Sequence, residues 1–176
     1  METDVKRKIV TSEEYEKLPE GSPYQLINGE LIMSPATKDN HQAILIELAA
    51  GFFLHVKEKL LGSIRTAPYD VHFDEENIFQ PDIIFLSNEN LKNVLDDGYF
   101  HGVPELVIEI LSTGTANYDL TKKMHVYEHF GVREYFVIHP VDKEVHCYRL
   151  QEHKFKEAYI ESGIIRSEVL QAEFVF

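Results

Sequence analysis

The segment LVIEIL, residues 106–111, is the feature of this sequence that most restricts the fold. Five of its six residues are apolar, and it follows Pro104, so it has the length and composition of a strand buried on both faces. Such strands belong to sheets that helices cover on both sides. The exception is Glu109, because a carboxylate in a buried strand carries a large desolvation cost unless a cation or hydrogen-bond donors lie beside it.

Helical and extended patterns surround this strand. Apolar residues recur at helical spacing over residues 39–61 and 117–130, and a glycine follows each segment. Within residues 24–34, two apolar runs flank Asn28 and Gly29, a dipeptide typical of a tight hairpin. Further strands are predicted over residues 63–73, 81–86, 134–139, 144–150 and 155–160, and a short helix over 88–98. This order of elements indicates an α/β or α+β domain.

The chain length fits a single folded domain. Its 176 residues lie within the usual range of about 100–200 for a domain, and we predict an N-terminal arm over residues 1–19 and one domain over 20–176. No stretch reaches the roughly 18 apolar residues that cross a bilayer, and the first residues lack the apolar core of a signal peptide. We therefore expect a cytoplasmic protein with no membrane segment. The single Cys147 excludes an internal disulfide framework.

Net charge argues against a general affinity for nucleic acid. Thirty acidic residues against 17 Lys and Arg give −13, whereas surfaces that bind phosphates are expected to be basic. A local basic cluster could still bind DNA, because charges are screened within about 8–10 Å at physiological salt. Candidates for such a cluster are Lys38, Arg65, Lys122 and Lys123.

Two carboxylates near strand ends point to a divalent cation. Asp82 follows Pro81 at the start of the predicted strand 81–86, and Glu109 lies in the buried strand. Carboxylates placed in this way suit Mg²⁺, which takes few protein ligands, keeps several waters and binds substrate phosphate oxygens. The sequence therefore predicts a metal site formed by these two residues.

A lysine is the third part expected of such a site. A lysine two residues after Glu109 would share its face of the strand, but Leu111 occupies that position. The nearest lysines lie in the following helix. Lys123 and Tyr127 are four residues apart beside the apolar stripe, so Lys123 could reach Glu109 while Tyr127 joins the core. Lys122 is rotated by about 100° and is expected to be solvated.

Three sequence motifs carry a resemblance to a known family. QPDIIFL begins at residue 80, GVPELVIEILSTGTANYDLTKKMHVYEHFGVREYFVI at residue 102, and YQLINGELIMSPATKDNH at residue 24. In this order they are similar to the Uma-type restriction endonuclease family, a branch of the PD-(D/E)XK nuclease-like superfamily. The resemblance covers roughly residues 20–140, and the ordered combination is far more specific than any one motif.

The resemblance implies an α/β fold with a restriction-endonuclease-like core, in which a central mixed β-sheet is flanked by helices. The sequence pattern adds an N-terminal hairpin and a C-terminal β-meander. The family's acidic positions match Asp82 and Glu109, and its displaced lysine matches Lys123. Glu30 and His41 match further family positions. A homodimer is also expected from the resemblance.

From this we predict a metal-dependent endonuclease that hydrolyses DNA. Asp82, Glu109 and the Ile110 carbonyl would hold Mg²⁺ or Mn²⁺, and a metal-bound hydroxide would attack phosphorus. Lys123 would orient the water or stabilise charge on the phosphate. Glu30 or His41 would add an outer metal contact or a proton relay. These five side chains, with the Ile110 carbonyl, are the candidate site.

Structural interpretations stay open for the same residues. Glu109 and Lys123 could form a buried salt bridge with no metal, and Asp82 could be an ordinary turn residue. Glu30 could serve only the solubility of the hairpin, and His41, at a helix N-terminus, is expected to be neutral and structural. The alternative function is a catalytically inactive binding module that acts through a protein partner.

Overall fold

The computed structural model describes residues 9–19, 21–34, 36–112 and 116–176, with the backbone alone at 116–120. The helices are α1 (Ser12–Tyr15), α2 (Asp39–Lys59) and α3 (Ala116–Phe130), with a 3-10 helix, η1 (Asn90–Asn93). The strands are β1 (Tyr24–Ile27), β2 (Glu30–Met33), β3 (Gly62–Thr66), β4 (Val71–Asp74), β5 (Asn77–Phe79), β6 (Ile83–Ser87), β7 (Phe100–His101), β8 (Leu106–Ile110), β9 (Glu134–His139), β10 (Glu144–Gln151), β11 (Lys154–Ser162), β12 (Ile164–Ser167) and β13 (Ala172–Val175).

A six-stranded mixed sheet forms the centre, in the order β11-β10-β9-β8-β6-β3. The interior strand β8 pairs antiparallel with β6 and parallel with β9, and α3 connects β8 to β9 across one face. Every residue of β8 is buried. The buried central strand expected from the sequence is therefore confirmed.

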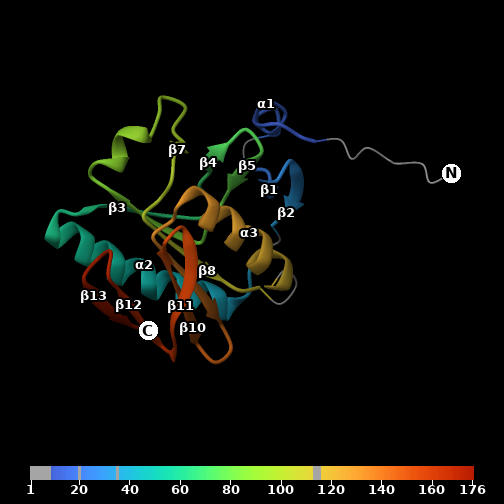
Figure 1. Ribbon diagram of the computed structural model, residues 1–176. Helices are drawn as coiled ribbons and strands as arrows, with labels where there is room; N and C mark the ends of the chain where they lie inside the picture. Colours follow the sequence, from blue (N-terminus) through green and yellow to red (C-terminus); the bar gives the residue numbers. More distant parts are fainter. Residues whose placement is uncertain (1–8, 20, 35, 113–115) are drawn as a thin grey trace.

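Helices α2 and α3 cover opposite faces of this sheet (Figure 1). On one face, α2 packs its apolar side chains against alternate residues of β6, β8 and β9. On the other face, Tyr127 of α3 packs against the intervening residues, among them Val107, Tyr135 and Val137. Since Glu109 is two residues from Val107, the period of two places it on the α3 face.

The N-terminal hairpin is confirmed as β1–β2, with Asn28 and Gly29 at positive φ in its turn. It belongs to a second sheet, in the order β2-β1-β5-β4-β7. Tyr15 of α1 is buried against Leu26 and Ile78 of this sheet. The first described residues thus pack on the hairpin, and the boundary predicted at residue 20 stays a prediction.

Two expected elements differ in the structure. The strand predicted over 63–73 is wrong, because β3 ends at Thr66 in the central sheet and β4 begins at Val71 in the second sheet. Pro68 has no N–H to donate to a ladder and lies in the connection between the two sheets. The helix predicted over 88–98 is wrong in its extent, because the structure has only the 3-10 helix η1 (Asn90–Asn93) in this segment.

The C-terminal strands extend the central sheet and add a short ribbon that packs against α2. Strands β9, β10 and β11 form the expected meander, and β12–β13 make a short ribbon. Phe174 of this ribbon stacks on Phe52 of α2, with ring centroids 4.0 Å apart. Across the described part of the chain, no helix has the length and apolar character needed to span a membrane.

Candidate functional site

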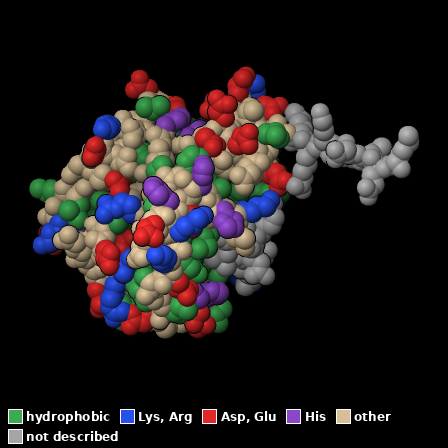
Figure 2. All heavy atoms as spheres, viewed as in Figure 1, with side chains coloured by type: hydrophobic (Ala, Val, Ile, Leu, Met, Phe, Trp, Pro, Cys, Tyr) green, Lys and Arg blue, Asp and Glu red, His purple; other side chains and the backbone are tan. Residues whose placement is uncertain are grey.

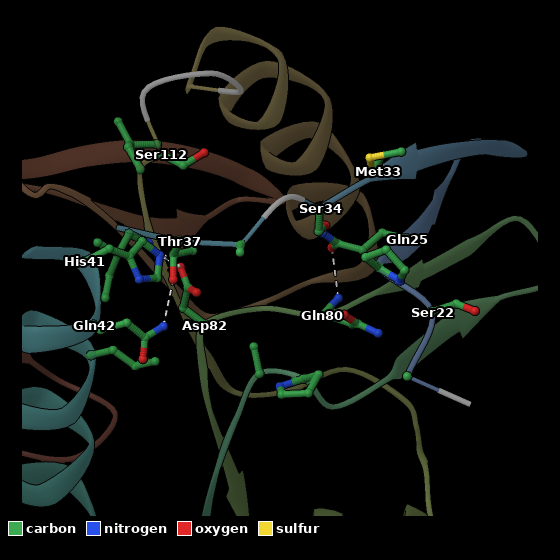
Figure 3. A pocket seen from close by; sticks show the side chains of 18 residues that line it. Ser22, Gln25, Met33, Ser34, Thr37, His41, Gln42, Gln80, Asp82 and Ser112 are labelled. Carbon is green, nitrogen blue, oxygen red and sulfur yellow. Dashed lines mark hydrogen bonds and ion pairs between the residues drawn. The ribbon is translucent and has the colours of Figure 1, made fainter. Parts of the chain in front are cut away.

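A cleft of about 390 Å³ opens where α2 begins and where β6 starts and β8 ends. His41 and Asp82 lie side by side at one end of it, and Gln25 and Gln80 lie at the other (Figure 3). Asp82 supplies the one acidic side chain among the residues that line the cleft, and none of those residues is a lysine or arginine. The lining therefore holds few ionisable side chains of either sign.

Asp82 is held in the cleft by a backbone donor and a histidine. The Ile110 N–H, at the end of β8, donates a 2.7 Å hydrogen bond to Asp82 Oδ2. His41 Nε2, from the first turn of α2, lies 3.3 Å from the same oxygen. The Asp82 side chain is 14% exposed, so it remains reachable from the cleft. The start of β6 and the end of β8 are thus joined through this carboxylate.

His41 is buried, and burial and the Asp82 carboxylate act on its pKa in opposite directions. Burial lowers the pKa of the His41 imidazole, but the hydrogen bond and the negative charge of Asp82 more than offset this effect. The net result is a pKa raised above the usual value, opposite in direction to the effect expected from the helix N-terminus alone. Its Nδ1 atom is buried and has no hydrogen-bond partner within the described residues.

Glu109 receives two donors from α3. Lys123 Nζ lies 2.9 Å from Glu109 Oε1, and the Tyr127 hydroxyl donates to the same oxygen at 2.7 Å. Lys123 and Tyr127 are one helical turn apart, and both are almost inaccessible. The prediction that Lys123 reaches Glu109 is confirmed by this contact. The role of Lys123 in catalysis stays a prediction.

Burial dominates the electrostatics of Glu109. Burial, together with the nearby charge of Asp82, raises the pKa of the carboxyl from 4.5 to about 7, against the lowering effect of the Lys123 ammonium. Burial also raises the pKa of the Tyr127 hydroxyl, with the Glu109 charge adding to the effect. Tyr127 therefore stays a hydrogen-bond donor to Glu109.

Glu30 lies apart from the other predicted residues. Its Oε2 atom is 3.0 Å from Lys122 Nζ, and it does not line the cleft. The expectation that Lys122 is solvated is wrong, because this side chain is only 33% exposed and is engaged by Glu30. The pair joins the second sheet, through β2, to α3.

The donor atoms of Asp82 and Glu109 suit a hard divalent cation. Among the described residues, no group hydrogen-bonds to Asp82 Oδ1 or Glu109 Oε2, so each carboxylate keeps one oxygen for a ligand. Mg²⁺ is usually held by one or two carboxylates and keeps several waters, so it needs no larger protein cage. The donor types therefore suit Mg²⁺ or Mn²⁺, and of the two carboxylates Asp82 is the one that lines the cleft.

Sequence reasoning missed three residues that shape the site. Tyr127 was expected only to fill the core, yet it holds Glu109. Gln25 is 5% exposed and accepts a hydrogen bond from the Gln80 backbone N–H at 2.9 Å, while the Gln80 side chain donates to Asp70. The position of Gln80 directly before Pro81-Asp82 was the available signal for its place in the cleft.

The fold belongs to the restriction-endonuclease-like class of α/β proteins. The sequence profile of the Uma2 family, described as "Putative restriction endonuclease", matches residues 12–175, and the chain belongs to this family. A solved structure from Anabaena variabilis, titled as "a putative nuclease belonging to DUF820", superimposes with a TM-score of 0.77. It covers 92% of this chain and 91% of its own at 22% identity, a likeness that concerns the fold. A comparison with curated proteins found no match.

Proposed function

We propose that this protein is a metal-dependent nuclease that hydrolyses phosphodiester bonds of DNA, with Asp82 and Glu109 holding Mg²⁺ or Mn²⁺. Membership of the Uma2 family supports the nuclease class. The observation that carries the metal site is the hydrogen bond from the Ile110 N–H to Asp82, which ties one carboxylate to the residue that follows the other. Each carboxylate is oriented by protein donors and keeps one oxygen for a ligand.

The protein's own groups prepare the two carboxylates. The Ile110 N–H and His41 fix Asp82, while Tyr127 and Lys123 fix Glu109 through a single oxygen. A bound divalent cation would supply a water of lowered pKa as the nucleophile. The Ile110 carbonyl is the third ligand that we propose.

Lys123 acts through Glu109 in this proposal. Its side chain is only 3% exposed and does not line the cleft, so its first contact is the Glu109 carboxylate. The ammonium favours the ionised form of Glu109, which is the form that binds a cation. We therefore propose Lys123 as a positioning residue, His41 as the proton carrier nearest to Asp82, and Glu30 as an outer group.

The distribution of charged side chains favours contact between the cleft and a single DNA strand. It does not favour a broad DNA-binding surface. Acidic and basic side chains are interspersed on the face in Figure 2, and no basic band crosses it. The cleft lining carries one acidic side chain, Asp82, and the exposed Lys38 directly precedes α2 beside it. Arg65 lies at the end of β3, two residues before Ala67, which lines the cleft. These two cations are the basic side chains nearest to the cleft in sequence.

The test is cleavage of supercoiled plasmid and single-stranded DNA with Mg²⁺ or Mn²⁺. Asp82→Asn and Glu109→Gln should abolish cleavage, while Asp96→Asn removes one exposed acid outside the cleft and should cleave like wild type. Calorimetric binding of Mn²⁺, lost in Asp82→Asn but kept in Asp96→Asn, tests the metal site independently of activity. Cleavage that survives in both site variants would refute the assignment.

A binding module is the second candidate, and the net charge of −13 favours it. In that case the Glu109–Lys123 pair would be a structural element of an inactive nuclease fold. Absence of cleavage with every metal, together with folded wild type and variants, would support this function. We also expect a homodimer in the cytoplasm, and sedimentation of only a 20.4 kDa species would exclude the dimer.

A further inference from the structure

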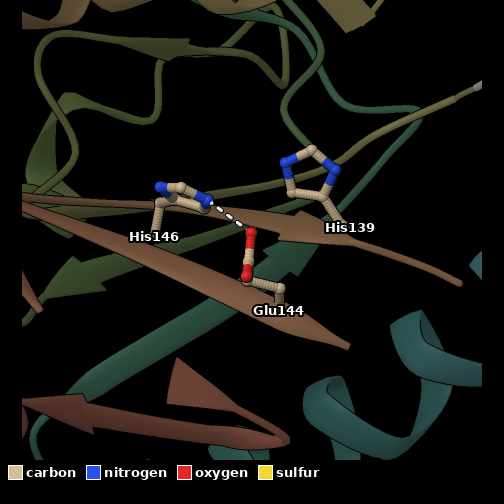
Figure 4. Close-up of side chains that lie close together, drawn as sticks. All are labelled: His139, Glu144 and His146. Carbon is tan, nitrogen blue, oxygen red and sulfur yellow. Dashed lines mark hydrogen bonds and ion pairs between the residues drawn. The ribbon is translucent and has the colours of Figure 1, made fainter. Parts of the chain in front are cut away.

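Three potential metal ligands converge on the β9–β10 hairpin, outside the Asp82–Glu109 site. His139 ends β9 and lies opposite Glu144 in the antiparallel register, and His146 is two residues further along β10. All three side chains therefore project from one face of the sheet. One ligand atom from each lies within 4.8 Å of the others, and the Glu144 carboxylate lies between the two imidazole rings (Figure 4).

The second carboxylate beside His146 is arranged as in known metal sites. Glu157 Oε1, on β11, lies 3.0 Å from His146 Nδ1, while Glu144 Oε1 lies 2.9 Å from His146 Nε2. Histidines that bind metals almost always donate the other ring N–H to such an outer partner, which fixes the ring orientation. Glu157 thus leaves Nε2 as the ligand atom, on the side of Glu144 and His139.

The spacing of the three ligands needs only small adjustments to hold zinc. Zn²⁺ binds imidazole nitrogen at about 2.0–2.1 Å and carboxylate oxygen at about 2.0–2.2 Å, so tetrahedral ligand atoms lie roughly 3.4 Å apart. The observed limit of 4.8 Å lies within reach of side-chain rotation. His139 and His146 are partly buried and Glu144 is exposed, so the fourth position can face water.

We propose that the β9–β10 hairpin binds a Zn²⁺ ion through His139, Glu144 and His146, with Glu157 orienting His146. Two imidazoles and one carboxylate favour zinc over the hard cations that suit Asp82 and Glu109. Bound zinc would join β9 to β10 by a side-chain bridge beyond their backbone ladder. Because Ile138 pairs with Ile110 in the parallel register, this bridge lies next to the strand end that carries the proposed active site.

The test is titration of chelator-treated protein with Zn²⁺ in excess Mg²⁺, followed by calorimetry. An Asp82→Asn background removes the other candidate site, and one Zn²⁺ should still bind. His139→Ala and His146→Ala should lose this binding, and Glu157→Gln should weaken it by about 10- to 100-fold. Co²⁺ in the same protein should give the visible absorption of a four-coordinate ion, absent from His146→Ala.

The matched control is His153→Asn. His153 is exposed in the turn between β10 and β11 and has φ of 62°, which asparagine tolerates, so zinc binding should be unchanged. If an alanine variant fails to fold, the nearly isosteric Glu144→Gln provides the same comparison. Absence of zinc binding by wild type, or equal binding by wild type, His139→Ala and Glu144→Gln, would overturn the proposal. Neither outcome bears on DNA cleavage.

Discussion

Replacing Lys123 with methionine should destabilise the protein in a manner that depends on pH. Methionine keeps the length and apolar contacts of the lysine side chain but removes the ammonium 2.9 Å from Glu109. Both side chains of the pair are nearly inaccessible, at 3% and 11% exposure. Glu109 would then be a buried carboxylate whose one remaining donor, among the residues that the structure describes, is the Tyr127 hydroxyl.

The magnitude follows from the burial of Glu109. Its pKa of about 7, raised chiefly by burial from 4.5, corresponds to roughly 3 kcal/mol of uncompensated cost for the ionised form even with Lys123 present. Removing one partner of a buried pair typically costs about 3–5 kcal/mol. Because Glu109 takes up a proton when its pKa rises, the pH-dependent part of this loss grows by about 1.4 kcal/mol per unit above pH 7 and reaches about 2 kcal/mol at pH 8.5.

The sign of the pH dependence follows from the same shift. A carboxyl whose pKa is raised on folding stabilises the native state most below its unfolded pKa, and this contribution is lost as pH rises through the folded value. In wild type, the decrease in stability that comes from Glu109 ends near pH 7. Without Lys123, the pKa of Glu109 in the folded state rises further. The free energy of unfolding of the variant therefore continues to decrease above pH 7, and its difference from wild type grows with pH.

Urea unfolding at pH 6 and pH 8.5 measures this difference. Lys123→Met should cost much more at pH 8.5 than at pH 6, and adding Glu109→Gln should recover most of the loss. The matched control is Lys122→Met, at the neighbouring position, whose partly exposed pair with Glu30 should contribute less than about 1 kcal/mol. A loss independent of pH, or equal losses for both lysine variants, would refute the reasoning.

Three further predictions concern the core and the site. Tyr127→Phe removes the 2.7 Å hydrogen bond to Glu109 and should cost about 1.5–3 kcal/mol at pH 8.5 in urea unfolding, with a smaller loss at pH 6. Phe52→Ala empties a fully buried site stacked on Phe174 and should lower the free energy of unfolding by about 3–5 kcal/mol, whereas a loss below 1 would contradict this packing. Burial raises the pKa of Cys147 to about 12, so Ellman's reagent should label it only after unfolding.

Local sequence signals predicted most of the fold. The apolar run of β8, the helical spacing in α2 and α3, and the Asn28-Gly29 turn each depend on contacts close in sequence or on burial over a whole element. The split at residues 67–70 was not foreseen, because both β3 and β4 look extended and only the tertiary structure assigns them to different sheets.

The candidate site was also predicted only in part, because local sequence signals contain some of its contacts and not others. The pairing of Glu109 with Lys123 follows from one strand and the next helix, so spacing along the chain was sufficient. Asp82 contacts the Ile110 N–H, which is 28 positions away along the chain, and His41, which is 41 positions away. No local sequence pattern contains either contact. The raised pKa of His41 escaped prediction because it depends on that distant carboxylate.

The hydrogen bond between Asp82 and the Ile110 N–H makes one backbone amide a sensor of the cleft. A proton held by a carboxylate shifts its NMR resonance when that carboxylate gains a proton or a ligand, and its exchange with solvent slows or quickens accordingly. The NMR resonance of the Ile110 amide in an isotope-labelled sample would therefore report protonation of Asp82 or binding of a ligand to it, without a substrate.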